Sequence, residues 1–387
     1  MDLLIDLNLK IIMIRYLIIL MVLINSCAFS KLKKKEPTTD IFTYTGRFDL
    51  SDPQKPQFAH SGNQIVFQFK GDELRIGLSH KSNEDAGNKN FFCVIINNKV
   101  TQVLESTLDV KYHEIEINSP DSFVNIEVFK RTEASCGIAV FHGVEYEIGE
   151  LKKSPIIKRS IEWIGDSFLV GYGNLVSIEP PPEGNPSTGF HAVNENGYLG
   201  FGAIATRALK ANYSCVGMSG RGVYRNFDTS EEWTIPKVYP FLFPKDESLK
   251  KYDFSYKQDL IVVKIGTNDF GPEIRSHYNL ADSGRFVSTY LEFLKFVTEQ
   301  NPNSKIVLAM GGGITDYFPV GSKRLSRFRS WVKTIKIEAQ KKYLNTFGFF
   351  EFNLQESPYG EDWHPTVKSQ EKFANEITPF LREFMNW

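Results

Sequence analysis

Four short segments in the C-terminal half of the chain carry residue types that together could hydrolyse an ester. The segments read GDSF at 165–168, MSGRG at 218–222, GTND at 266–269 and DWHP at 362–365. Ester hydrolysis at neutral pH needs a nucleophile better than water, a base that takes its proton, and donors for the oxyanion that forms. The Ser, His, Gly and Asn of these segments supply a candidate for each requirement.

Each candidate has a role that its chemistry suggests. Ser167 is the candidate nucleophile, and His364 is the candidate general base, which later returns the proton to the leaving group. The candidate oxyanion donors are the backbone N–H groups of Ser167 and Gly220 and the side-chain amide of Asn268. Gly222 is an alternative to Gly220 as a donor.

The elements around these segments predict how they meet. The predicted strands cover Ile161–Gly165, Tyr213–Ser219, Asp259–Gly266, Ser304–Gly312 and Asn345–Asn353, and the predicted helices cover 198–211, 284–300, 323–343 and the stretch after Pro365. Apolar strands that alternate with amphipathic helices predict a parallel sheet covered on both faces. Because ligands meet the carboxyl ends of the strands in such a sheet, the segments that follow the strands should lie at one edge.

The chain before residue 155 follows a different pattern. Short runs such as NQIVFQFKG, ELRIGLSH and SFVNIEVFKR are separated by turn signals, among them Asn97-Asn98 and Gly62-Asn63. This pattern predicts an antiparallel β sandwich of the jelly-roll kind. We therefore expect two domains, an all-β sandwich at 41–152 and an α/β/α three-layer domain at 155–387.

The four segments, in this order, resemble the motifs of the SGNH (GDSL-like) hydrolases, and the resemblance covers roughly residues 160–387. The longer stretches GDSFLVGYGN, SGRGVYRN, VKIGTNDF and DWHPT, behind a jelly-roll domain, are similar to carbohydrate esterase family 2. Members of that family remove acetyl groups from plant polysaccharides and favour the primary 6-hydroxyl of hexoses. The resemblance implies the SGNH fold and an esterase that deacetylates acetylated xylan, glucomannan or a similar polysaccharide.

The resemblance leaves the partner of His364 open. Many SGNH enzymes place an Asp three residues before the His, whereas Glu361 stands at that position here and Asp362 stands two residues before. Some family 2 members use a Ser–His dyad in which a main-chain carbonyl orients the His. The three possible arrangements are a dyad, a triad with Asp362 and a triad with Glu361. Trp363 is a candidate for stacking on a sugar ring, with core packing as its alternative.

The N-terminal segment is predicted to be an export signal. Tyr16–Ile24 is an apolar run, too short for a transmembrane helix, which needs about 20 residues. The order of residues 1–27 resembles a bacterial lipoprotein signal, in which Cys27 is lipidated, and a lysine-rich tether at 28–40 follows. Free secretion, with Cys27 incidental, and no export are the alternatives. We expect a cell-envelope protein at the periplasm or cell surface that meets a membrane only through its lipid anchor.

Composition and the remaining reactive side chains exclude other function classes. The 45 Lys and Arg residues balance 46 Asp and Glu residues, so no global field attracts a nucleic acid. Apart from His364, the His residues, His191 among them, lack metal-ligand spacing and are assigned to ordinary positions, so we expect no metal or cofactor. Cys93, Cys136 and Cys215 have apolar neighbours and are expected to be buried, and their odd number predicts a free thiol.

Two further function classes remain as alternatives to a polysaccharide esterase. One is a surface carbohydrate-binding lipoprotein with a catalytically idle SGNH fold, and the other is a lipase or thioesterase of the same superfamily. The combination of Ser167, Gly220, Asn268 and His364 favours an enzyme, because an idle site has no need of a base and an oxyanion amide at once.

Overall fold

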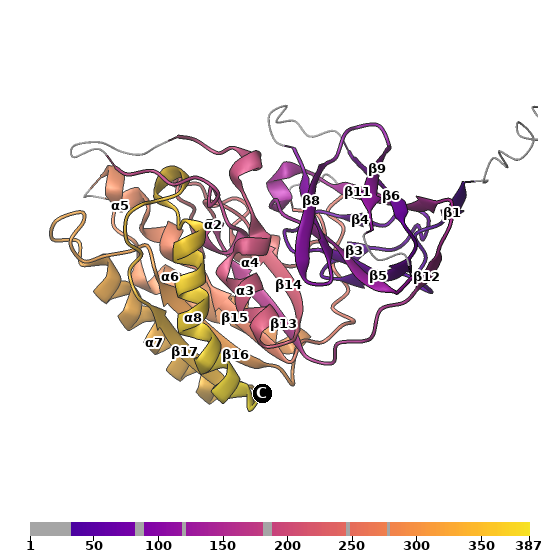
Figure 1. Cartoon of the computed structure of the whole chain (residues 1–387). Coiled ribbons are helices and arrows are strands. Elements are labelled where there is room, and N and C mark those ends of the chain that lie inside the picture. The colour runs from indigo at the N-terminus through magenta and orange to yellow at the C-terminus, as the bar shows by residue number, and fades with distance from the viewer. Residues whose placement is uncertain (1–31, 82–88, 118–120, 181–187, 245–247, 277–278) are drawn as a thin grey trace, which may run out of the picture.

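The computed structural model describes residues 32–81, 89–117, 121–180, 188–244, 248–276 and 279–387. In Figure 1 an all-β part, drawn in indigo to magenta, lies beside a part in which helices cover a sheet, drawn in magenta to yellow. The predicted export signal and Cys27 lie outside the described residues. Within the described ranges, no helix combines the length and the apolar character that crossing a membrane requires.

The all-β part contains two antiparallel sheets. Its strands are β1 Lys33–Lys35, β2 Thr43–Thr45, β3 Phe48–Asp49, β4 Gln57–Phe58, β5 Gln64–Lys70, β6 Glu73–His80, β7 Phe91–Ile96, β8 Lys99–Glu105, β9 Lys111–Glu116, β10 Val124–Lys130, β11 Ala139–Tyr146 and β12 Glu150–Lys152. One sheet has the order β3-β4-β11-β6-β9 with β1 beside β11, and the other has the order β12-β5-β10-β7-β8 with β2 beside β5. β1 lies within the predicted tether.

The two sheets enclose one apolar core. Along β5, buried residues alternate with partly exposed ones, which places Ile65, Phe67 and Phe69 in this core. Asn97 and Asn98 form the predicted turn between β7 and β8, and their φ values of 48° and 68° are those that a two-residue hairpin turn requires. The predicted antiparallel sandwich is confirmed.

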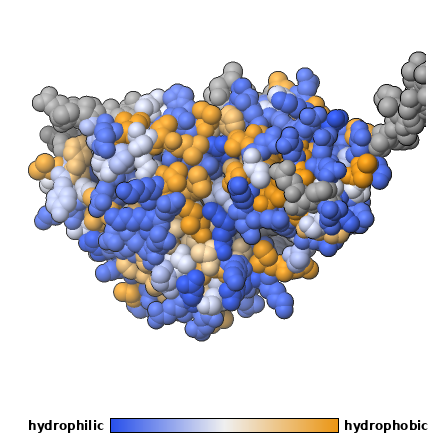
Figure 2. Space-filling model, in the orientation of Figure 1, coloured by the Kyte–Doolittle hydropathy of each residue, from blue (hydrophilic) through white to orange (hydrophobic). Residues whose placement is uncertain are grey.

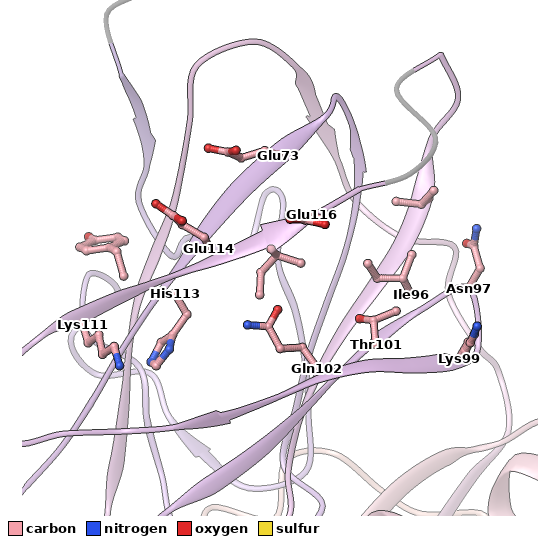
Figure 3. A pocket seen from close by; sticks show the side chains of 13 residues that line it. Glu73, Ile96, Asn97, Lys99, Thr101, Gln102, Lys111, His113, Glu114 and Glu116 are labelled. Carbon is pink, nitrogen blue, oxygen red and sulfur yellow. The ribbon is translucent and has the colours of Figure 1, made fainter.

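A cavity of about 810 Å³ opens between β8 and β9, the last strands in the order of the two sheets. Figure 3 shows the polar side chains around it, including Gln102, Lys111, His113 and Glu114. Its lining residues lie between Glu73 and Val124, far along the chain from the four segments that carry the ester chemistry. The candidate active site therefore lies elsewhere.

The C-terminal part contains the predicted parallel sheet. Its strands are β13 Ser160–Gly165, β14 Asn212–Gly217, β15 Leu260–Lys264, β16 Lys305–Gly311 and β17 Phe347–Phe352, in the order β14-β13-β15-β16-β17. Its helices are α2 Ser167–Val170, α3 Phe201–Ala208, α4 Ile235–Val238, α5 Pro272–Arg275, α6 Ser283–Gln300, α7 Arg324–Lys342 and α8 Val367–Met385. The helix predicted at 198–211 is shorter than expected, because residues 197–199 form a 3₁₀ turn and Lys210 has a positive φ of 54°.

Both faces of this sheet are buried, as its continuous apolar strands predict. Trp163 of β13 packs against α3, with its ring centroid 5.5 Å from that of Phe201, and shares one core with residues of α8. The next residue, Ile164, belongs to the opposite core, which includes Phe286 of α6 and Phe328 of α7. The three-layer α/β/α fold is confirmed.

The strand register brings three of the four polar segments to one edge of the sheet. Gly165 at the end of β13 pairs with Gly217 at the end of β14 and with Lys264 at the end of β15. Because these three strands end at the same level, the segments that begin at Asp166, Met218 and Ile265 start side by side.

A buried ion pair joins the sandwich to the parallel sheet. Arg47, which is 1 % exposed, donates from Nη2 to Oε1 of Glu162 at 3.0 Å, and Tyr239 donates its hydroxyl to Oε2 of Glu162 at 2.6 Å. The Arg47 guanidinium also lies 4.3 Å from the centre of the Tyr239 ring. A charge pair that is removed from water in this way is stable only while both partners are present.

Replacing Arg47 with Met should therefore lower the free energy of unfolding by about 3–5 kcal/mol, because Glu162 becomes a buried charge without an ionic partner. Urea unfolding followed by tryptophan fluorescence measures the change. The double variant Arg47→Met, Glu162→Gln should recover most of the loss, since the amide still accepts the Tyr239 hydroxyl. A loss below about 1 kcal/mol in the single variant would contradict a structural role for this pair.

Candidate active site

Ser167 lies at the first position of α2, directly after the end of β13. Asp166 caps this helix, because its side chain accepts the Phe168 N–H at 3.2 Å. Asp166 Oδ1 also lies 3.5 Å from Nζ of Lys264, a buried lysine at the end of β15. Ser167 is 6 % exposed, so the turn holds its hydroxyl at the sheet edge with little access for bulk water.

His364 meets Ser167 at this edge. His364 Nε2 lies 2.7 Å from the Ser167 Oγ, and Nδ1 lies 2.9 Å from the main-chain oxygen of Glu361. A carbonyl oxygen can only accept, so in the neutral imidazole Nδ1 carries the proton and Nε2 is free to accept from the Ser167 hydroxyl. Desolvation lowers the pKa of His364 below its ordinary value of 6.5, and the hydrogen bond to the Glu361 carbonyl opposes part of that shift.

The two residues before His364 have an unusual backbone conformation. Asp362 and Trp363 both have positive φ, 48° and 64°, which is rare for residues other than glycine. The Asp362 carboxylate accepts the Tyr172 hydroxyl at 2.6 Å and the amides of Thr188 at 2.9 Å and Gly189 at 3.3 Å. These three donors tie the left-handed turn to the loop that follows α2.

The Glu361 carboxylate is held by the same loop region. It is buried, and it accepts from His191 Nδ1 at 2.7 Å, from Asn194 Nδ2 at 2.7 Å and from the His191 main-chain N–H at 3.2 Å. These bonds fix the residue whose main-chain oxygen faces His364. The structure thus brings Ser167, His364 and a main-chain carbonyl together, while both neighbouring carboxylates bind loop donors.

The predicted oxyanion donors lie on the two neighbouring strand ends. Gly220 has a φ of +74°, and an added Cβ atom would have no neighbour within 4 Å, so the side of Gly220 where a side chain would stand is open. Asn268 Nδ2 donates one of its two hydrogens to the Arg221 main-chain oxygen at 3.0 Å. Gly222, the alternative donor, gives its N–H to the Asn226 side chain at 3.2 Å. This contact favours Gly220 over Gly222.

Asp269 shapes the loop that presents Gly220. Its carboxylate accepts the amides of Val223, Tyr224 and Arg225 at 2.7, 3.0 and 3.3 Å. Burial raises the pKa of Asp269 to about 7, and these three amides oppose the shift. Asp269, the last residue of the GTND segment, therefore fixes the backbone of the loop that contains Gly220 through buried hydrogen bonds.

Several residues of the site carry no recognisable signal in the sequence. The Tyr172 ring stacks on the His364 imidazole, with centroids 4.1 Å apart, although its position in GDSFLVGYGN does not reveal this contact. His191, for which the sequence predicts an ordinary position without metal-ligand spacing, donates to the Glu361 carboxylate. Trp363 is 39 % exposed, and its ring centroid lies 4.7 Å from that of Tyr359. Cys93, Cys136 and Cys215 are buried, as their apolar neighbours predict, and all three are free thiols.

Comparisons with known proteins agree with this architecture. Residues 44–155 match the family model "Carbohydrate esterase 2 N-terminal", and residues 163–372 match "GDSL-like Lipase/Acylhydrolase family". A cellulase/esterase CelE from Acetivibrio thermocellus is 28% identical over 89% of this chain, which spans 39% of that protein. An acetylxylan esterase / glucomannan deacetylase from Cellvibrio japonicus is 27% identical over 68% of this chain and 72% of its own length.

Solved structures show the same two-part arrangement. A family two carbohydrate esterase from Clostridium thermocellum, in complex with cellohexaose, is 28% identical, with a TM-score of 0.78 over 89% of this chain and 99% of that chain. An acetyl xylan esterase from Butyrivibrio proteoclasticus has a TM-score of 0.77 at 19% identity over 92% of this chain and 100% of that chain, so it supports the fold alone.

A fluorophosphonate probe should label Ser167, at a rate that depends on the charge of His364. A protonated imidazole cannot accept the serine proton, so the rate should fall as the pH drops through the pKa of His364. Because desolvation lowers this pKa, we expect the midpoint below pH 6.5. Intact-protein mass spectrometry over an acid-to-neutral pH series measures it, with Ser167→Ala as the unlabelled control. A midpoint above 6.5 would contradict the desolvated, neutral base.

Proposed function

This chain belongs to the GDSL-like lipase/acylhydrolase family, and we propose that it is a carbohydrate esterase that removes acetyl groups from plant polysaccharides. The observation that carries the proposal is the 2.7 Å contact between Ser167 Oγ and His364 Nε2 at the edge of the parallel sheet. The match of residues 44–155 to the N-terminal region of carbohydrate esterase 2 directs the proposal from esters in general to carbohydrate esters.

The names of two relatives support a proposed substrate class. The Cellvibrio protein carries the name acetylxylan esterase / glucomannan deacetylase, and the Clostridium structure contains cellohexaose. We propose acetylated xylan, glucomannan or a similar polysaccharide as the substrate, with a preference for 6-O-acetyl hexoses. Trp363 is the proposed sugar-contacting residue, because its half-exposed ring lies next to the base.

The proposed reaction is an acyl transfer through an acetylated serine. Ser167 Oγ attacks the acetyl carbonyl while its proton moves to His364 Nε2. The oxyanion that forms accepts hydrogen bonds from the N–H groups of Ser167 and Gly220 and from the second hydrogen of the Asn268 amide. When the carbon–oxygen bond to the sugar breaks, His364 gives its proton to the leaving sugar hydroxyl. A water molecule then attacks the acetyl carbon while His364 takes its proton, the bond between the acetyl carbon and Ser167 Oγ breaks, and His364 returns the proton to Oγ as acetate leaves.

We propose that Ser167 and His364 act as a dyad. The Glu361 main-chain oxygen accepts a hydrogen bond from Nδ1–H of His364, a role that a carboxylate has in a full triad. The carboxylates of Glu361 and Asp362 hold this carbonyl and the left-handed turn in position, and in the proposed mechanism neither becomes the direct partner of Nδ1. Tyr172 restricts the imidazole further, because its ring covers one face.

We also propose that the protein is exported and anchored through Cys27. The support is the sequence of residues 1–27, together with the extracellular location of plant polysaccharides. The lysine-rich residues 28–40 would then connect the anchor to the sandwich, at 41–152, and the hydrolase domain, at 155–387, with β1 of this segment paired to β11 in the sandwich.

Replacing Ser167 with Ala should remove nearly all acetate release, with a loss of at least about 10³-fold in kcat. The assay measures acetate from acetylated xylan, acetylated glucomannan and hexose acetates, with circular dichroism as the control for folding. Activity of the variant within about tenfold of the wild type would contradict the nucleophile. A wild-type protein that binds these polysaccharides and releases no acetate would instead support the idle binding protein, and hydrolysis of long-chain acyl esters alone would support a lipase.

The dyad makes a separate prediction for the two acids. Asp362→Asn and Glu361→Gln should each keep kcat within about tenfold of the wild type, because both amides can still accept hydrogen bonds from the loop. His364→Ala should lose at least about 10³-fold in the same acetate assay. A loss of about 10⁴-fold in only one acid variant, as tautomer loss produces in a full triad, would identify that carboxylate as the direct partner.

A further inference from the structure

The sandwich reaches the active site through the segment that follows β10. After Lys130, residues 131–136 leave the sheet and cross to the hydrolase domain, where Gly197 donates its N–H to the Arg131 main-chain oxygen at 3.0 Å. Glu133 lies at the centre of this segment and is 4 % exposed. A carboxylate in such a place requires hydrogen-bond donors on both oxygens.

Those donors come from both domains. Glu133 Oε2 accepts the Ser219 main-chain N–H at 2.8 Å and the Ser219 hydroxyl at 2.6 Å, and Oε1 accepts the hydroxyl of Ser135. The Glu133 main-chain N–H donates to Oε2 of the buried Glu195 at 2.8 Å. Every one of these contacts is short, and two of the partners belong to the hydrolase domain.

Ser219 is the residue directly before Gly220, the proposed oxyanion donor. Gly220 has no side chain, and the position where one would stand is open, so the only direct attachment at Gly220 among the described contacts is its main-chain oxygen, which accepts the Phe227 N–H at 2.9 Å. The loop is held on one side by Asn268, which binds the Arg221 main-chain oxygen, and on the other by Glu133, which binds Ser219. The peptide N–H of Gly220 lies between these two attachments.

The same sandwich segment also supports the region that holds the base. Arg131 Nη2 donates to the main-chain oxygens of Val193 at 3.1 Å and Glu195 at 3.0 Å. Asn194 lies between these two residues and binds the Glu361 carboxylate. The segment therefore contacts the loop around Gly220 through Glu133. Through Arg131 it contacts the two neighbours of Asn194, which holds Glu361, and the Glu361 main-chain oxygen faces His364.

We propose that Glu133 is a positioning residue for catalysis, through which the β sandwich holds the Ser219-Gly220 backbone in the geometry that receives the oxyanion. The inference rests on the proposed esterase function. In this inference, a residue of the sandwich positions the backbone of the proposed oxyanion donor in the hydrolase domain. Glu133 acts through Ser219, and its removal changes the stabilisation of the transition state more than the binding of the substrate.

Kinetics on 4-nitrophenyl acetate test the proposal with matched variants. Glu133→Ala should lower kcat at least about tenfold and change KM less than about threefold. Asn268→Ala, which removes a proposed oxyanion donor, should likewise lower kcat more than it changes KM. Glu133→Gln should stay within about threefold, because its amide oxygen still accepts from Ser219 and its NH₂ can donate to Ser135. Asp49→Ala is the control, since Asp49 joins the domains through Lys250 and does not contact the loop.

Hydrogen–deuterium exchange at the Ser219 amide gives a readout that needs no turnover. Glu133→Ala should accelerate it, whereas Asp49→Ala should leave it unchanged. If Glu133→Ala does not fold, Glu133→Asp, whose carboxylate is one carbon shorter, should show the same loss of kcat and the same faster exchange.

Two results would overturn the inference. One is an active wild type together with a Glu133→Ala variant, or Glu133→Asp in its place, whose kcat stays within about threefold of the wild-type value. The other is unchanged exchange at Ser219. A wild type that hydrolyses no ester overturns the proposed function instead, and the exchange measurement then still decides whether Glu133 holds the loop.

Discussion

The hydrogen bond between His364 Nδ1 and the main-chain oxygen of Glu361 is the constraint on which the proposed chemistry depends. It determines which nitrogen carries the proton and therefore leaves Nε2, 2.7 Å from the Ser167 Oγ, as the acceptor. The carbonyl reaches this position through a turn with two consecutive left-handed residues, and each such residue costs about 1–3 kcal/mol. The carboxylates of Glu361 and Asp362, with six hydrogen bonds from the loop between Tyr172 and Asn194, offset that cost.

The two domains share the work of holding this geometry. The parallel sheet supplies the edge, because β13, β14 and β15 end at one level and present Ser167, Gly220 and Asn268 together. The sandwich packs beside β14, with the Phe129 ring stacked on that of Tyr213 at 6.0 Å between centroids, and its residues 131–136 lie next to Ser219 and the proposed oxyanion donor Gly220. In this account the buried ion pair of Arg47 and Glu162 fixes the position of the sandwich relative to the parallel sheet, so that Glu133 contacts Ser219.

The sequence predicts the scaffold well and the fine geometry of the site poorly. Strand and helix periodicity, with turn residues such as Asn97 and Asn98, identifies both folds because those signals are local. Ser167 and His364 are identifiable because each lies within a recognisable motif, GDSF and DWHP. The contacts of Asp362 with Tyr172 and of Glu133 with Ser219 join residues 190 and 86 positions apart, and no local pattern encodes them. The backbone carbonyl that faces His364 leaves no trace in residue identity at all.

Nitrogen NMR of the imidazole tests the central claim most directly. In protein labelled with ¹⁵N-histidine, at a pH above the pKa of His364, the account predicts that Nδ1 of His364 is protonated and Nε2 is not. His364→Ala identifies the signal by its loss, and Ser167→Ala should preserve the tautomer, because the Glu361 carbonyl remains. A neutral imidazole protonated at Nε2 would contradict the account, since that nitrogen could not then accept the proton of Ser167.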